Sequence, residues 1–168
     1  MTTSRSLALG ATEVEVQLEG DDLAERWDLR YDARTAGPVD GGRTARLVLR
    51  PSREGPALPD AWQPSLSARR EGQTVAVDWP AARGRFDLAA REGEFHIRSD
   101  VRGFGLAIED VLRVLAFELS LVDDVLLLHA AAVGPVDAPW VDLFAGRSGV
   151  GKTTLTERLV ATGEEAVS

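Results

Sequence analysis

The chain has 168 residues, of which 44% are hydrophobic, enough for one sizeable buried core in one domain or two small ones. Its formal net charge of −8 argues against general binding to nucleic acid or to a membrane surface, because both depend on clustered lysine and arginine. The absence of cysteine excludes disulfides and thiolate chemistry.

The chain carries no signal for export or for membrane insertion. The opening residues, MTTSRSLALG, lack the apolar stretch of a signal peptide, and no apolar run approaches the roughly 18 residues of a membrane span. We therefore expect a cytoplasmic protein. Only one of the 19 basic residues, Lys152, is a lysine. This skew toward arginine is typical of GC-rich coding, so we expect a bacterial source.

In residues 13–97 apolar and polar side chains alternate, the pattern of strands with one buried face. Turn-rich segments separate the alternating sets. We therefore expect an antiparallel, half-exposed sheet, interrupted by an irregular loop at residues 50–70, which contain four prolines. The expected strands include residues 14–18, 27–31, 45–49, 75–79, 86–88 and 95–97.

The pattern changes at Gly105. Residues 106–122 have helical spacing with a broad apolar face. Nearly all-apolar strands are expected at 125–133 and 140–145, buried on both faces. A helix should start at Lys152 and stop near Gly163, and residues 164–168 should begin one more strand. The sequence therefore predicts an α/β protein, with a β-rich lobe at 1–104 and the start of a nucleotide-binding domain at 105–168.

The stretch GRSGVGKTT, residues 146–154, matches the phosphate-binding pattern G-x-x-x-x-G-K-[ST] in every fixed position. An expected strand precedes it and an expected helix follows, as this motif requires. Its glycines allow positive φ and let backbone N–H groups converge on a phosphate. The helix that follows directs its own N–H groups and positive dipole end at the same anion.

Each residue type in the loop has an expected role with ATP and Mg²⁺. Lys152 should reach the β and γ phosphates, and Thr153 should place its hydroxyl on Mg²⁺. Thr154 should support the first helical turn, and the side chain of Arg147 should point outwards. The predicted nucleotide-binding residues are Gly146, Arg147, Ser148, Gly149, Val150, Gly151, Lys152, Thr153 and Thr154, with Thr153 also the metal ligand.

Other polar residues give weaker signals. On its residues alone, His129 in an apolar strand fits a hydrogen-bonded core residue better than a catalytic one. The acidic pairs at 123–124 and 164–165 fit solvated turns or caps. Phosphoryl transfer also needs a carboxylate at the end of the strand after the P-loop helix, and the sequence reaches Ser168 before one appears.

The segment LLLHAAAV followed by FAGRSGVGKTTLTERLVATGEEAVS resembles the P-loop kinase domain of the HPr kinase/phosphorylase family, over about residues 106–168. The resemblance implies an HPr-kinase/PEP-carboxykinase-like P-loop domain that transfers phosphate from ATP to a serine of a protein or peptide. It places His129 beside the phosphates, as a catalytic candidate. It also implies that the catalytic aspartates of the next strand are missing, so that the domain is truncated and at best binds nucleotide.

The N-terminal lobe does not match the regulatory domain of the full-length bacterial enzymes. It is more similar to shorter kinase-like proteins, some encoded beside peptide-maturation genes, and this puts HPr itself in doubt as the substrate. Two alternatives stay open: another P-loop ATPase or small-molecule kinase, and a non-catalytic binding module with a vestigial P-loop. The sequence predicts neither the phosphoryl acceptor nor the oligomeric state.

Overall fold

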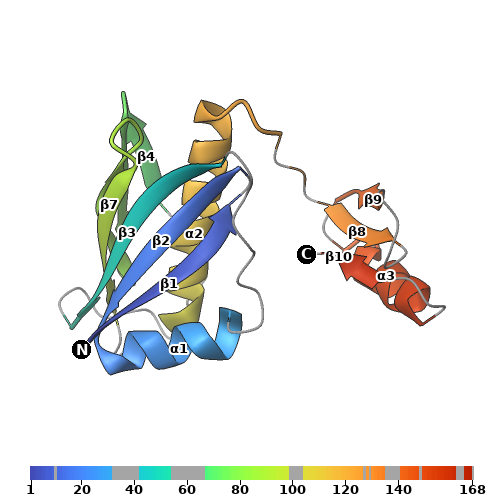
Figure 1. Ribbon diagram of the computed structural model, residues 1–168, viewed down its shortest axis with the longest axis horizontal. Helices are drawn as coiled ribbons and strands as arrows, with labels where there is room; N and C mark the ends of the chain where they lie inside the picture. The colour runs from blue at the N-terminus through green and yellow to red at the C-terminus, as the bar shows by residue number, and fades with distance from the viewer. Residues whose placement is uncertain are drawn as a thin grey trace. The chain divides into compact units, whose positions relative to one another are not determined.

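The structure is a computed structural model that describes residues 1–9, 11–31, 42–53, 67–98, 104–126, 128, 130–134, 141–147, 149–161 and 165–167. The chain divides into two compact units, Met1–Leu126 and Leu127–Ser168. Figure 1 labels the helices and strands of both units. The described residues contain both helices and sheets, and this confirms the predicted α/β class.

The first unit is built on a seven-stranded mixed sheet. In spatial order its strands are β1 (Thr2–Leu9), β2 (Thr12–Glu19), β3 (Arg43–Ser52), β7 (Glu92–Arg98), β6 (Ala82–Asp87), β5 (Thr74–Trp79) and β4 (Ala68–Glu71). The β2–β3 and β3–β7 pairs are parallel, and the other neighbours are antiparallel. The expected antiparallel sheet is therefore wrong at β3, which runs parallel to both of its neighbours.

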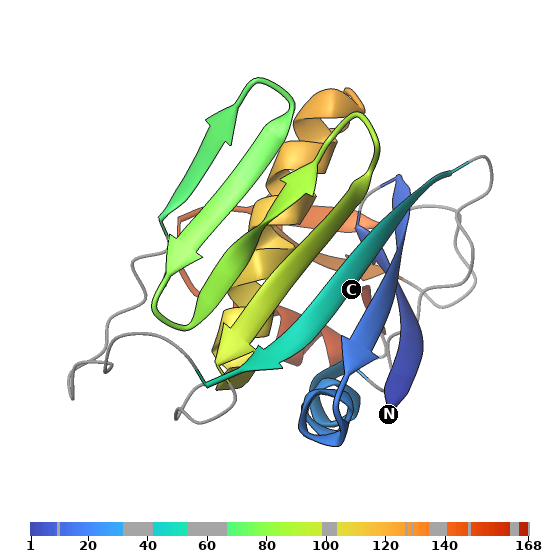
Figure 2. The same cartoon turned by 90° about the vertical axis from the view of Figure 1, so that its left-hand side faces the viewer.

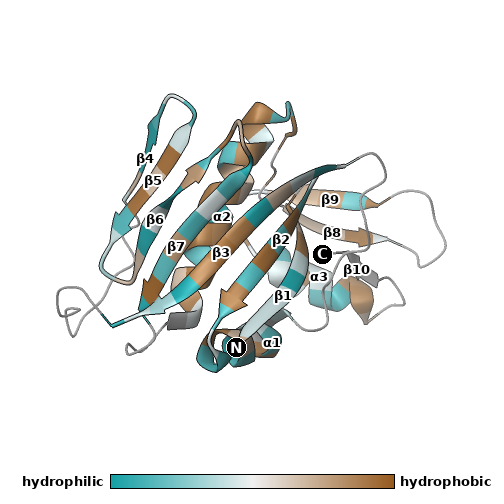
Figure 3. Ribbon diagram, turned by 60° about the vertical axis from the view of Figure 1, so that its left-hand side comes forward, coloured by the Kyte–Doolittle hydropathy of each residue, from teal (hydrophilic) through white to brown (hydrophobic). Residues whose placement is uncertain are grey.

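Two helices, α1 (Asp21–Tyr31) and α2 (Phe104–Val122), cover one face of this sheet, as Figure 2 shows for α2. Alternate residues of the inner strands β2, β3 and β5 point toward the helices and are buried, and Figure 3 shows this alternation of hydropathy along β2 and β3. The opposite face carries charged and polar side chains. The core of the first unit includes Val14, Val16, Leu18, Leu47, Leu49, Phe86, Phe95, Ile97, Ile108, Leu115 and Leu119.

Most of the predicted strands are confirmed: residues 14–18, 45–49, 75–79 and 95–97 lie in β2, β3, β5 and β7. Phe86 lies in β6, which ends one residue before Leu88. The prediction of a strand at 27–31 is wrong, because these residues belong to α1. Of the expected loop at 50–70, residues 50–52 belong to β3 and 68–70 to β4, while 54–66 lie outside the described residues.

The helix expected at 106–122 is confirmed as α2, but α2 belongs to the first unit. It packs against β1, β6 and β7 through a face that includes Ala107, Ile108 and Val111. The first compact unit therefore ends at Leu126, whereas the boundary drawn at 104/105 assigned this helix to the C-terminal domain.

The second unit contains β8 (Ala130–Gly134), β9 (Asp142–Ala145), α3 (Lys152–Val160) and β10 (Glu165–Val167). Its sheet has the order β10-β8-β9, both pairs are antiparallel, and α3 packs against β8 and β10. The expected helix and last strand are confirmed. Val125 and Leu126 lie outside any strand, so the strand expected at 125–133 begins later, at Ala130.

The strand before the P-loop is exposed, contrary to the expectation of burial on both faces. Leu143 in β9 is 55% exposed. The reason is that, within the described residues, the helix of this unit packs mainly on β8 and β10, so the faces of β9 are little covered.

Candidate P-loop site

Residues 146–151 connect β9 to α3 in the strand–loop–helix arrangement that the motif requires. Gly149 has φ 80° and Gly151 has φ 95°, backbone conformations that side chains with a Cβ adopt only at a cost. Within the loop the Val150 N–H donates to the Arg147 carbonyl at 3.3 Å, which closes a turn. Glycine at two of the predicted positions therefore meets a conformational requirement of this loop.

The Lys152 side chain folds back over the loop that precedes it. Its Nζ donates to the Gly146 carbonyl at 2.8 Å and to the Arg147 carbonyl at 3.1 Å. An ammonium has three donors, so two bonds to the loop leave one for another acceptor. The lysine is thereby held at the loop, where a single cation can meet a phosphate oxygen.

The N-terminus of α3 is uncapped. Gly151 is the N-cap residue and offers no side-chain acceptor. The first intrahelical bond there runs from the Leu155 N–H to the Gly151 carbonyl at 2.9 Å. The N–H groups of the first turn thus lack the side-chain cap that usually satisfies one of them, and the positive end of the helix dipole lies beside them.

Thr153 and Thr154 lie in the first turn of α3, and both are exposed. The hydroxyl that bonds the helix backbone is that of Thr156, which donates to the Lys152 carbonyl at 3.0 Å. The Thr153 hydroxyl suits one ligand position of Mg²⁺, which usually keeps several waters and takes phosphate oxygens as well. Within the described ranges there is no group of three or more His, Cys, Asp or Glu that could hold a metal by itself.

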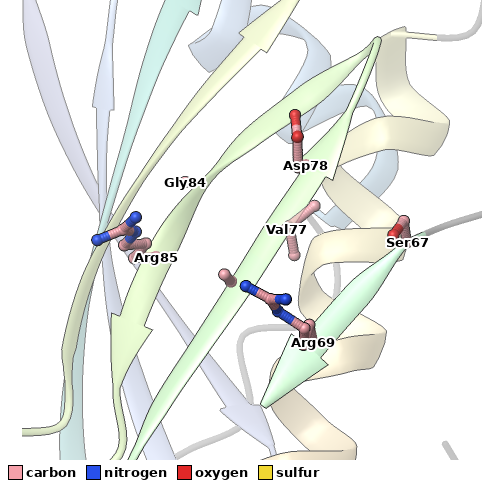
Figure 4. Close-up of a pocket in the computed structure, with 7 residues that line it drawn as sticks. Ser67, Arg69, Val77, Asp78, Gly84 and Arg85 are labelled. Carbon is pink, nitrogen blue, oxygen red and sulfur yellow. The ribbon is translucent and has the colours of Figure 1, made fainter. Parts of the chain in front are cut away.

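Two predicted site residues, Ser148 and His129, lie outside the described residues, and so does the helix stop expected at Gly163. The position of His129 beside the phosphates stays a prediction. Arg147 is exposed, as expected for a side chain that points outwards. A pocket of about 530 Å³ lies in the first unit, lined among others by Ser67, Arg69, Asp78 and Arg85. Figure 4 shows these side chains, with Arg69 on β4, Asp78 on β5 and Arg85 on β6. The pocket contains none of the predicted site residues.

Asp123, expected in a solvated turn, is the centre of an ionic cluster that the sequence did not predict. The carboxyl side chain is 4% exposed. It accepts a hydrogen bond from Thr12 Oγ1 at 2.7 Å and forms ion pairs with Arg43 and Arg91. Arg91 also donates to Thr12 at 3.1 Å. No spacing in the sequence indicates this cluster, because its members come from four separate segments.

Burial by itself raises the pKa of the Asp123 carboxyl, since it disfavours the charged form. Hydrogen bonds from Arg91, Thr12 and Arg43 outweigh this effect and lower the pKa from 3.8 to about 2. Asp123 is therefore ionised at neutral pH and compensated by its partners. Its role is to hold the end of α2 against the sheet.

Comparison with known proteins reveals no relative: no family model, no curated protein and no solved structure matches the chain. In the described part of the chain, no helix combines the length and the hydropathy needed to cross a bilayer. The P-loop assignment therefore depends on the motif and on the geometry of the loop.

Proposed function

We propose that residues 146–154 form the phosphate-binding loop of a cytoplasmic, ATP-dependent kinase that phosphorylates a serine of a protein or peptide. The observation that carries this proposal is the Lys152 ammonium, held by two carbonyls of a loop with two left-handed glycines. A glycine-rich turn without a ligand role has no need to fix a lysine ammonium in this way.

The residues of the loop would each bind a different part of the nucleotide. Backbone N–H groups at the uncapped start of α3 would bind phosphate oxygens. Lys152 would supply a positive charge to the β and γ phosphates, and Thr153 would hold Mg²⁺ through its hydroxyl. Magnesium ATP supplies the phosphoryl group when it is bound. The contribution of the loop is thus positioning and electrostatic stabilisation.

Transfer to serine also needs a carboxylate that accepts the hydroxyl proton. Residues 146–155 contain no Asp or Glu, so this group must come from elsewhere. For this reason nucleotide binding and phosphoryl transfer are tested separately. Binding of magnesium ATP without phosphoryl transfer would support the P-loop assignment and contradict the kinase assignment.

The binding test is isothermal titration calorimetry with magnesium ATP on the wild-type chain and on Lys152→Ala. We expect the substitution to weaken binding at least about tenfold, since it removes the charge-assisted bonds to the phosphates. Arg147→Ala is the matched control, because it removes an exposed cation of the same loop. Equal affinities of Lys152→Ala and the wild type would refute the P-loop assignment.

The transfer test follows radiolabelled γ-phosphate from ATP to a set of serine-containing peptides, with Lys152→Ala as the inactive control. Labelling of peptide by the wild type alone would support the kinase assignment. Release of inorganic phosphate without labelled peptide would instead indicate an ATPase.

A further inference from the structure

We draw no further inference here: the strongest candidate, the apolar surface patch that Phe117 and Leu121 form on α2, where they are 52% and 54% exposed, carries no proposal because nothing in the structure shows what covers it.

Discussion

Asp123 follows the last turn of α2, and its N–H still donates to the Leu119 carbonyl at 2.9 Å. Its carboxylate meets Thr12 at the start of β2, Arg43 at the start of β3 and Arg91 just before β7. A buried charge is costly unless partners compensate it. Here three partners do so, and each belongs to a segment that must be in place before the cluster can form.

This cluster predicts a pH dependence of stability. The pKa of Asp123 is about 2 in the folded chain and 3.8 ordinarily, so its contribution is present above pH 3.8 and is lost as the pH falls toward 2. Asp123→Asn should lower the free energy of unfolding by about 2 kcal/mol at pH 7. Urea denaturation at several pH values measures the difference between wild type and variant. A difference that stays constant from pH 7 to pH 2 would contradict the ionic role.

The P-loop and the Asp123 cluster show why single residues differ in how well they can be predicted. Lys152 and its glycines lie in one contiguous stretch, so the motif by itself predicts a glycine-rich loop between strand and helix. Asp123 bonds to Thr12, which lies 111 positions away, and to Arg91, which lies 32 positions away. Nothing in the local sequence distinguishes such an aspartate from one in a solvated turn, because its partners are brought to it by the tertiary fold.

Among the elements, α1 shows how two periodicities can coincide. Trp27, Leu29 and Tyr31 alternate as in a strand, yet Leu29 is 73% exposed and Trp27 is buried together with Leu23, four positions earlier. The helical spacing of Leu23 and Trp27, with Asp21 and Asp22 in the first turn, is the pattern that the fold uses. For α2, whose apolar face is much longer, one periodicity fits and the prediction is confirmed.

Strand direction could not be read from the sequence. Alternation gives the same pattern in parallel and antiparallel strands when one face is buried. The parallel pairing of β3 depends on which strands it meets, and both partners are separated from it by other elements. The sequence therefore predicted most strands but not their topology.

The pairing of β6 with β7 requires a glycine at position 84. A Cβ there would lie 2.1 Å from the Glu94 carbonyl oxygen and 2.6 Å from the Phe95 Cα, both backbone atoms. Gly84→Ala should therefore destabilise the first unit by about 3 kcal/mol. Thermal unfolding followed by circular dichroism measures the change.

Gly105→Ala is the matched control, because a Cβ at Gly105 meets nothing within 4 Å in the first turn of α2. It should leave stability unchanged or raise it by about 0.5–1 kcal/mol, since alanine is the better helix former. Equal melting temperatures for the two variants would show that the strands separate at Gly84 without cost.

At the scale of the whole molecule, the two units differ in their cores. The largest fully buried side chains in the described part of the chain, among them Trp27, Phe86 and Phe95, all belong to the first unit. In the second unit α3 has no buried residue, and Val133 in β8 is the buried hydrophobic side chain described there. The larger core thus lies in the first unit, whereas the predicted P-loop lies in the less buried second unit.

The position of β3 also sets an order of events when the chain folds. β1 pairs with β2, and β4 to β7 pair in succession, so both groups form between neighbours in the sequence. Within the sheet they join only through β3, and each of its two parallel pairings closes a long loop. The entropy of closing these loops is lost before the new contacts form. The docking of β3 should then limit the rate of folding.

Leu47→Ala in β3 should slow refolding in stopped-flow experiments, whereas Val75→Ala in β5 should mainly speed unfolding. If Val75→Ala slows refolding and Leu47→Ala does not, the kinetic barrier lies in the formation of the hairpins.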